Sequence, residues 1–381
     1  MLERRFRAGF FGLLAVVATL GCTPAPSAAP APAPSGTSAA TSETTAPTGA
    51  APPAALAAPG APAGAPVPAV VKVTDYQIVA GAGHYIAEAK GYFKEAGLDV
   101  EFVRSSPPDM LPLMVSNQLD VGVTSVNAGL FNAFARGLPI RIVADHAANA
   151  GPGTGSTLVI RKDLVDDGTY RGVADLRGRK VASANTADAT MIDLAKILAN
   201  AGLALSDIDF TLLPFPDILA ALENRAIDAS YYQEPFVTIA ADRGWVVRGP
   251  QGGDVYPEHQ IGLVLYNERM LGDRDLGMRY MRGYVRGVRD YRKAMWDRDP
   301  AAFDEVVPIL VERTAVKERA LFEKMGPTNL KYDPIPNVST MAADQDWFIE
   351  NGYQQQRVDM ERAVELSFVE QAIRELGAGA R

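Results

Sequence analysis

Polar and aromatic side chains gather in short loops, each of which directly follows an apolar, strand-like run. In the first half of the chain these loops supply Gly83, His84, Tyr85, Ser105, Thr124, Ser125 and Asn127. In the second half the matching loops supply Asn185, Thr186, Asp188, Ala189, Tyr231, Tyr232 and Glu234. Side chains of this kind bind small molecules by hydrogen bonding and stacking, without covalent chemistry. We therefore interpret these residues as candidate ligand-binding residues.

The charge of the predicted ligand stays open. Residues 81–84 and 185–189 lie at expected helix starts, whose free N–H groups favour an anion such as a sulfonate or nitrate. Asp188, Glu234 and the tyrosines instead favour a flat, neutral or partly cationic nitrogen compound, such as a pyrimidine-type vitamin precursor. There are also purely structural alternatives. Asp188 is suited to cap a helix, Tyr232 to pack inward, and Glu234 to bind the backbone beside Pro235.

Catalytic, metal and nucleic-acid chemistry have little support in the sequence. The only histidines, His84, His146 and His259, are too far apart for a metal motif, and Cys22 is the only cysteine. No GxSxG motif follows a strand into a helix. With 37 Lys and Arg against 45 Asp and Glu, the chain is too acidic to favour a phosphate backbone. We predict no catalytic residues, no metal, no cofactor and no nucleic-acid partner.

The elements that would position these loops alternate between strand and helix from Val71 onward, which is typical of an α/β fold. One expected helix spans 81–97. The stretch "AGLDVEFVRSSPPDMLPLMVSNQLDVGVTS" is echoed by "AGLALSDIDFTLLPFPDILAALENRAIDASYY". This repetition predicts two similar lobes, each a mostly parallel sheet flanked by helices. Ligands of such sheets bind beyond the carboxyl ends of the strands, so a cleft between the lobes is expected.

The same segments carry a family resemblance. "GYFKEAGLDVEFV", "LDVGVTSVNAGLFNAFARGLPIRIVAD", "AIDASYYQEPF" and "LSFVEQAIRELG" resemble the solute-binding proteins of nitrate, sulfonate, taurine and thiamine-precursor ABC importers. The resemblance covers residues 71–377. It implies a two-lobe, type II periplasmic-binding-protein fold that closes over a small solute and delivers it to permease subunits with a cytoplasmic ATPase. A membrane-tethered ligand sensor and a pyrimidine-synthase-like enzyme are the alternatives.

The resemblance also implies a domain organisation. Lobe 1 begins at 71–154, lobe 2 occupies 155–255, and 256–381 returns to lobe 1 and ends in C-terminal helices. The hinges would be "GPGTGS" and "GPQGGDVYPEH". A monomer is expected. The helix "LGMRYMRGYVRGVRDYRKAMW" places five arginines around an apolar stripe, which indicates either a solvated basic face or a contact with a permease or anionic lipid.

Residues 1–22 have the pattern of an export signal, with Arg4, Arg5 and Arg7 before a short apolar core. "TLGC" resembles the lipobox of bacterial lipoproteins, although Thr19 and Leu20 depart from its usual residues. Residues 23–70 are almost only Ala, Pro, Ser, Thr and Gly, a composition that cannot bury a core. We predict export, lipidation at Cys22, and a disordered tether that holds the folded part near a bacterial membrane.

Overall fold

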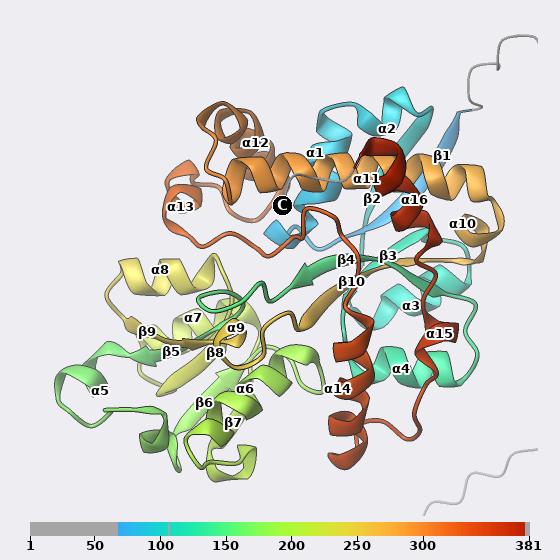
Figure 1. The fold of residues 1–381 in the computed structure, drawn as a ribbon. Helices are drawn as coiled ribbons and strands as arrows, with labels where there is room; N and C mark the ends of the chain where they lie inside the picture. Colours follow the sequence, from blue (N-terminus) through green and yellow to red (C-terminus); the bar gives the residue numbers. More distant parts are fainter. Residues whose placement is uncertain (1–67, 106, 378–381) are drawn as a thin grey trace, which may run out of the picture. The chain divides into compact units, whose positions relative to one another are not determined.

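A computed structural model of the chain describes residues 68–105 and 107–377. The chain divides into two units, Met1–Ala61 and Pro62–Arg381, and every described residue lies in the second unit. The predicted export signal, Cys22 and nearly all of the predicted tether lie outside the described residues. Figure 1 shows the described elements as two sheets with helices around them.

The first sheet combines four strands of the early chain with one strand that returns much later. Its order is β2-β1-β3-β10-β4. The strands are β1 Ala69–Asp75, β2 Leu98–Arg104, β3 Val121–Ser125, β4 Arg141–Ala148 and β10 Gln260–Tyr266. The early helices are η1 Val79–Gly81, α1 Ala82–Ala89, α2 Tyr92–Glu95, α3 Pro107–Val115 and α4 Ala128–Ala135. The later helices are α10 Glu268–Gly272, α11 Arg274–Met295, α12 Pro300–Arg313, α13 Arg319–Lys324, α14 Val338–Glu350, α15 Met360–Ala363 and α16 Ser367–Leu376.

All strands of the second sheet lie between β4 and β10 in the sequence. Its order is β7-β6-β8-β5-β9. The strands are β5 Thr157–Arg161, β6 Lys180–Ser183, β7 Asp209–Leu212, β8 Ala229–Tyr232 and β9 Val246–Gln251. The helices are α5 Lys162–Asp166, η2 Val173–Leu176, α6 Ala189–Asn200, η3 Leu205–Asp207, α7 Phe215–Glu223, α8 Phe236–Asp242 and α9 Gly252–Val255.

The two sheets have the same topology. In the first, β1 pairs in parallel with β2 and β3, and β10 pairs antiparallel with β3 and β4. In the second, β6 pairs in parallel with β7 and β8, and β5 pairs antiparallel with β8 and β9. The expected α/β fold of two lobes is confirmed. In each sheet, the strand that pairs antiparallel with its neighbours, β10 or β5, is the first strand after the chain crosses from the other sheet. Each sheet therefore contains both parallel and antiparallel pairs.

The helix expected over residues 81–97 is two helices. Gly91 has φ +77°, a left-handed conformation that ends α1 and starts α2 in a new direction. The pattern of apolar residues every three or four positions continues across this break, because both helices pack toward the same core. Periodicity alone therefore predicted a continuous helix.

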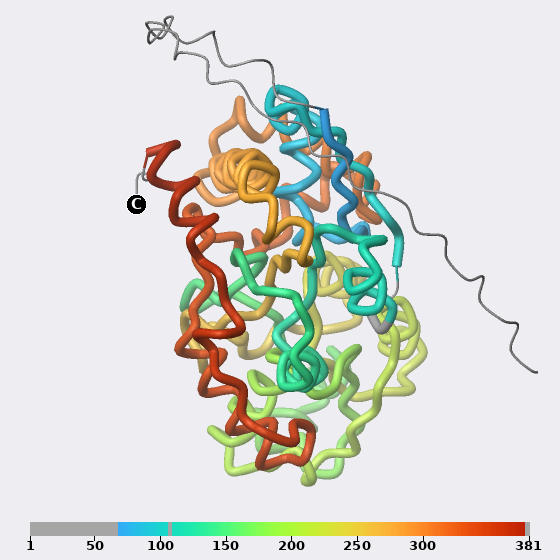
Figure 2. Tube along the Cα trace, turned by 90° about the vertical axis from the view of Figure 1, so that its right-hand side faces the viewer, coloured from blue at the N-terminus to red at the C-terminus, as the bar shows by residue number. Residues whose placement is uncertain are grey.

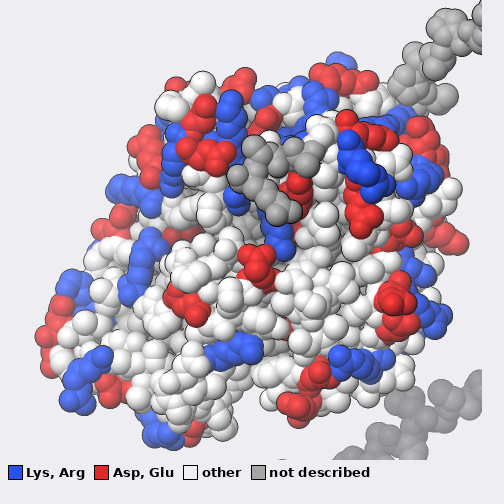
Figure 3. All heavy atoms as spheres, in the orientation of Figure 1, with Lys and Arg blue, Asp and Glu red and all other residues white. Residues whose placement is uncertain are grey.

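The long helix α11 covers the first sheet with its apolar stripe buried and most of its arginines in ion pairs. Tyr280, Tyr284, Val288 and Tyr291 are all fully buried. Arg282, Arg286 and Arg289 form ion pairs with Glu375, Glu95 and Asp333, at 2.8, 2.6 and 2.8 Å. Figure 3 shows blue and red atoms interspersed over the α11 and α12 part of this face. The arginines thus form a mixed-charge surface.

The C-terminal segment packs against helices that belong to both sheets. Figure 2 shows it, in red, running along one side from the level of α11 down past α4. Along this path α16 packs on α11, and α14 packs on both α4 and α6. No described helix combines the length and the apolar character that a membrane crossing requires.

Candidate functional site

A cavity of about 220 Å³ lies between the two sheets, at the carboxyl ends of their parallel strands. The first sheet contributes Tyr76 after β1, Thr124 and Ser125 at the end of β3, and His146 in β4. The second sheet contributes residues after β6, β7 and β8, namely Asn185, Asp188, Thr190, Phe215, Gln233 and Glu234. Two other segments complete the wall. The chain that crosses from the first sheet to the second contributes Asn149, Gly155 and Ser156, and the C-terminal segment contributes Thr328 and Asn329. Both lobes would therefore touch one ligand.

Five of the predicted residues lie on this wall: Thr124, Ser125, Asn185, Asp188 and Glu234. The alternatives for two of them also hold. Asp188 caps α6, because its Oδ1 accepts from Met191 N at 3.1 Å. Glu234 binds the backbone at the start of α8, because its Oε2 accepts from Thr238 N at 3.1 Å. Each carboxylate therefore has both a structural partner and a place on the cavity wall.

Gly83, His84 and Tyr85 lie in α1 and do not line the main cavity. They are buried because α1 packs between the first sheet and α11. The Tyr280 hydroxyl lies 2.8 Å from His84 Nδ1, and the Tyr85 hydroxyl donates to Asp75 Oδ1 at 2.6 Å. His84 and Tyr85 border a much smaller cavity of about 10 Å³, which shares Tyr76 and His146 with the main one. These three residues therefore belong to the packing of α1 and not to the wall of the main cavity.

Tyr231 and Tyr232 are also absent from the cavity wall. They are 3% and 0% exposed in β8, where successive side chains point to opposite faces of the sheet and both faces are covered. Tyr231 donates to Asp193 Oδ2 at 3.4 Å, and the Tyr232 hydroxyl donates to the Phe215 carbonyl oxygen. The inward-packing alternative therefore applies to both tyrosines.

The other four predicted residues surround the cavity without lining it. Ser105 is partly buried beyond β2, and Thr186 is exposed. Asn127 caps α4, where its Oδ1 accepts from Leu130 N at 2.8 Å. The N–H of Ala189 donates to the Val126 carbonyl oxygen at 2.9 Å, so the starts of α4 and α6 meet through their backbones. The backbones at the starts of α4 and α6 therefore join the two lobes beside the cavity.

The sequence prediction missed Tyr76, His146, Asn149, Ser156, Thr190, Gln233, Thr328 and Asn329. Two signals were available. Gln233 lies between two predicted residues, and Asn149 and Ser156 flank the glycines of the predicted first hinge. Thr328 and Asn329 had no such signal, because they follow α13 and reach the cavity only when the returning chain folds back.

The cavity wall is rich in unpartnered hydrogen-bond acceptors. Asn149 Oδ1, Asp188 Oδ2 and Asn329 Oδ1 are buried and have no hydrogen-bond partner among the described residues. Burial raises the pKa of Asp188 to about 6, while the Thr190 hydroxyl and Met191 N–H oppose the shift. None of the described residues that line the cavity is Lys or Arg. Because the wall holds the carboxylates of Asp188 and Glu234 and no cationic side chain among the described lining residues, it favours a neutral or cationic ligand over an anion.

Nothing on the wall offers a strong anion site. Burial lowers the pKa of His146 to about 3, so its ring is neutral at physiological pH. The helix starts of α6 and α8 are already occupied by Asp188 and Glu234. Phe215 adds a flat apolar surface, stacked on Phe236 with a ring distance of 5.5 Å. In residues 68–105 and 107–377, no His, Cys, Asp and Glu cluster has the arrangement of a metal site.

Residues 80–264 match the family model described as NMT1/THI5 like. No protein of curated function matches the sequence. The alkanesulfonate-binding protein SsuA of Xanthomonas axonopodis pv. citri, solved with MOPS, is 18% identical with a TM-score of 0.62. That alignment covers 79% of this chain and 99% of SsuA.

Two further solved structures mark the range of the fold. The periplasmic nitrate-binding protein NrtA of Synechocystis PCC 6803 is 15% identical with a TM-score of 0.66, over 83% of this chain and 91% of NrtA. The desulfurization enzyme DSZB is 12% identical with a TM-score of 0.56, over 81% of this chain and 99% of DSZB. At these identities the likeness shows the fold alone, and the fold is shared by binding proteins and an enzyme.

Proposed function

We propose, on the premise that residues 80–264 belong to the NMT1/THI5-like family, that this protein is the solute-binding component of an ABC importer. The observation that carries the proposal is the cavity of about 220 Å³, whose wall is built by both sheets and holds two carboxylates, Asp188 and Glu234. A solute that contacts both lobes stabilises their closed arrangement, because it binds that arrangement more tightly than an open one. The solute then passes to permease subunits driven by a cytoplasmic ATPase.

The solute we propose is small, flat and hydrogen-bond donating, neutral or cationic, such as an aminopyrimidine-type nitrogen compound. Sulfonate and nitrate, which the names of SsuA and NrtA indicate for those proteins, offer only acceptor oxygens. Placed here they would share the cavity with the carboxylates of Asp188 and Glu234, with no Lys or Arg among the described lining residues. Phe215 would stack on the flat face of the solute.

An enzymatic function has less support than solute binding. A hydrolytic site needs a nucleophile within hydrogen-bond reach of a base. His146 is the only histidine on the cavity wall, and its Nε2 has no hydrogen-bond partner among the described residues. The hydroxyls that share this wall, Ser125 and Ser156 among them, therefore lack an activating base.

The lobe boundaries that we propose are 71–154 and 256–381 for lobe 1 and 155–255 for lobe 2. Two crossing segments, residues 151–156 and 249–259, would be the hinges. They lie against each other, since Gly253 N donates to the Thr154 carbonyl oxygen at 2.9 Å. A chain that crosses twice at one place can bend there while each sheet stays intact.

We also propose that the protein is exported and lipidated at Cys22, with residues 23–70 as its tether and a monomeric binding unit above the membrane. A Pro-rich chain of this composition is extended, at about 3.1 Å per residue. The Cys22→Ser variant should be released from membranes that retain the parent protein. Equal retention of both would exclude a lipid anchor at this position.

A thermal-shift panel tests the function. The purified chain is screened with aminopyrimidines, flavins, nitrate, sulfonates and aromatic acids, and the matching solute should raise the melting temperature. A ligand at 100 times its Kd adds about 2.7 kcal/mol of stability. The Ser125→Trp variant fills the cavity and should lose the shift, whereas Ser116→Trp, at an exposed position after α3, should keep it. An unchanged shift in Ser125→Trp would place binding elsewhere.

A further inference from the structure

The helices α6 and α8 cover opposite faces of the second sheet. Val181 of β6 shares a hydrophobic core with Leu194 of α6, whereas the next residue, Ala182, shares a different core with Val237 of α8. Successive residues of a strand point to opposite faces of the sheet. The second sheet can therefore meet the rest of the chain on either side, through α6 or through α8.

The first sheet is covered in the same way. Val264 of β10 shares a core with Phe322 of α13, and the next residue, Leu265, shares another core with Met341 of α14. The helix α14 packs on α6, and α13 packs on α8. The two sheets thus meet along two flanks, which we call the α6 flank and the α8 flank.

On the α6 flank the two sheets are joined by backbone hydrogen bonds and by a shared core. Ala128 N donates to the Ala187 carbonyl oxygen at 3.0 Å, and Ala189 N donates to the Val126 carbonyl oxygen at 2.9 Å. Ala189 and Ile192 of α6 are 0% and 2% exposed, and they belong to the core that the first sheet forms with α3, α4 and α14. The start of α6 therefore packs as a part of the first lobe.

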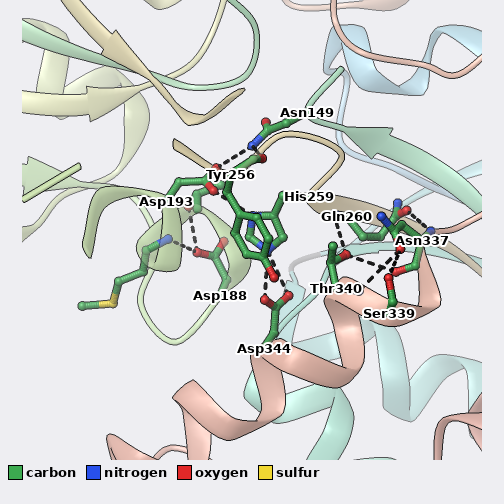
Figure 4. Close-up of polar contacts among 12 residues, drawn as sticks. Asn149, Asp188, Asp193, Tyr256, His259, Gln260, Asn337, Ser339, Thr340 and Asp344 are labelled. Carbon is green, nitrogen blue, oxygen red and sulfur yellow. Dashed lines mark hydrogen bonds and ion pairs between the residues drawn. The ribbon is translucent and has the colours of Figure 1, made fainter. Parts of the chain in front are cut away.

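Buried ion pairs strengthen the same flank. His259 Nδ1 lies 2.7 Å from Asp193 Oδ1 of α6, and its Nε2 lies 2.9 Å from Asp344 Oδ2 of α14 (Figure 4). An imidazole that donates from both nitrogens carries a positive charge. Burial lowers the pKa of His259, but the hydrogen bonds and charges of Asp193 and Asp344 outweigh burial and raise it to about 9. Because all three side chains are buried, separating α6 from α14 would leave buried charges without partners.

Both crossing segments lie beside this flank. His259 ends the second crossing segment, residues 249–259. Asn149, two residues before the first crossing segment, donates from Nδ2 to Asp193 Oδ2 at 3.1 Å. The proposed hinges and the buried interlobe contacts are therefore on the same side of the cleft.

On the α8 flank the contact between the lobes is exposed to solvent. Lys324 Nζ of α13 lies 2.7 Å from Asp242 Oδ2 of α8, and the two side chains are 58% and 41% exposed. Figure 1 shows α13 above α8 at this place. An exposed ion pair changes an equilibrium constant by no more than about five-fold. Parting α13 from α8 therefore costs much less than parting α14 from α6.

The cavity can be reached from the α8 flank. Pro327 and Thr328, which follow α13, and Gln233 and Glu234, which precede α8, all line the cavity. Moving α8 away from α13 would therefore open the wall of the cavity to solvent.

We propose that the solute enters between α8 and α13, with the Lys324–Asp242 ion pair as the latch of this entrance, while the start of α6 stays attached to the first lobe as the pivot. This inference rests on the proposed function and adds to it the route of the solute. A hinge movement of this kind keeps each sheet intact and breaks only exposed contacts.

The reactivity of a thiol inside the cavity tests the entrance without a solute. The full chain carries Cys22→Ser, which removes the native thiol, and Ser125→Cys, which places one on the cavity wall. A bulky maleimide reaches this thiol only while the entrance is open. Asp242→Lys places two cations at the latch, and we expect the reaction to be about three- to ten-fold faster. Adding Lys324→Asp to this variant should restore the parent rate. Ser156→Cys is a second reporter on the same wall.

The matched control is Asp304→Lys. Asp304 of α12 lies 2.5 Å from Arg319 of α13, so the change disrupts an exposed ion pair of the same helix within the first lobe. It should leave the reaction rate unchanged. If Asp242→Lys did not speed the reaction, or if Asp304→Lys sped it equally, the entrance would lie elsewhere. No solute is present, so the thermal-shift panel still decides the proposed function separately.

Hydrogen exchange tests the pivot in the same proteins. The amides of Ala128 and Ala189 donate across the α6 flank, so they stay protected as long as this flank stays closed. We expect equal protection in the parent and in Asp242→Lys. Exchange of these amides that rises by the same factor as the thiol reaction would show that both flanks open together, and the pivot would be wrong.

Discussion

His259 and Gln260 are neighbours in the sequence, and each contacts a buried aspartate. The two residue pairs differ in charge. Gln260 Nε2 donates to Asp145 Oδ1 in β4, behind the first sheet's side of the cavity. His259 contacts Asp193 in α6, behind the second sheet's side. Burial raises the pKa of Asp145 to about 6, whereas Asp193 has an imidazolium as its partner. The first pair can neutralise by taking a proton, but the second keeps its charges.

The cavity wall has the same asymmetry. Both carboxylates on the wall, Asp188 and Glu234, come from the second sheet, while the first sheet contributes neutral groups such as Tyr76, Thr124 and His146. The second sheet thus supplies both carboxylates of the wall, of which Glu234 is ion-paired with Arg248 at 2.8 Å, and the first sheet supplies uncharged groups. The strand topology determines where the loops lie, and the side chains on those loops determine what each lobe can bind.

The largest effect should come from His259→Gln. Because the folded pKa, about 9, lies above the unfolded value of 6.5, the charged ring stabilises the fold fully below pH 6.5. This stability is lost as the pH rises from 6.5 through 9, and it amounts to about 3 kcal/mol. Urea unfolding at pH 6, 8 and 10 should show the variant much less stable than the parent at pH 6 and closest to it at pH 10.

The partner experiment is Asp145→Asn. A buried acid with a raised pKa of about 6 costs stability once it ionises, so this loss appears as the pH rises from 3.8 through 6. The variant should therefore equal the parent near pH 4 and exceed it at pH 8, by up to about 3 kcal/mol. If Asp145→Asn and His259→Gln changed stability in the same direction at pH 8, the contrast between the two pairs would be lost.

Asp188→Asn should weaken the binding of a hydrogen-bond-donating solute roughly 30-fold, or about 2 kcal/mol, because it removes the charge on the second sheet's wall. The melting temperature of the free protein should hold or rise, since asparagine also caps helices and Asp188 is buried. Calorimetric titration with the solute identified by thermal shift measures the affinity. Below a pH of about 6, the parent should approach the variant, because Asp188 takes up a proton.

The matched control is Asp299→Asn. Asp299 caps α12, where its Oδ1 accepts from Ala302 N at 2.8 Å, and it does not line the cavity. It should leave affinity unchanged. If the parent protein bound an oxyanion more tightly than any hydrogen-bond-donating solute, the proposed preference of the cavity for donors would be wrong.

The sequence predicted the fold from features that repeat locally. Strand and helix alternation and the internal repeat placed Thr124, Ser125, Asn185 and Asp188 at strand ends, because that position follows from local pattern. It could not show that Tyr231 and Tyr232 are both covered, since the side that a β8 residue faces depends on helices packed from elsewhere. Residue type alone made them resemble ligand contacts.

Long-range structure explains the other differences. The strands β5 and β10 were not among the predicted elements, and each enters its sheet only because the chain crosses between lobes beforehand. A chain of hydrogen bonds from Asp344 through His259 and Asp193 to Asn149 joins residues up to 195 positions apart in the sequence. Three widely spaced histidines excluded a metal motif in the sequence, but their spacing could not reveal a buried ion pair.

A pair of glycine variants tests the crossing segment between the lobes. Gly155 and Gly153 have φ +90° and +79°, so alanine strains the backbone at both, by roughly 1–2 kcal/mol. Only at Gly155 would the new Cβ meet Asn149 Oδ1, at 2.3 Å. Because Gly155 lines the cavity and Gly153 does not, calorimetry should show about a ten-fold loss of solute affinity for Gly155→Ala and none for Gly153→Ala. Equal losses would mean that backbone strain, and not the cavity wall, controls binding.

The finest test exchanges one threonine on each wall for valine. Thr190 Oγ1 donates to Asp188 Oδ1 at 2.7 Å, and this bond helps to hold down the Asp188 pKa against burial. Thr124 Oγ1 only accepts from Asn127 Nδ2, at 3.3 Å. Thr190→Val should therefore move the midpoint of the pH dependence of solute binding upward from about 6, by about one pH unit or less for one hydrogen bond. Thr124→Val should leave the midpoint in place and change affinity less than three-fold, because the hydrogen-bond partner of Thr124 Oγ1 is the neutral amide of Asn127 and not a carboxylate. Titrations from pH 5 to 8 measure both midpoints, and a shift of equal size in the two variants would remove the electrostatic distinction between the lobes.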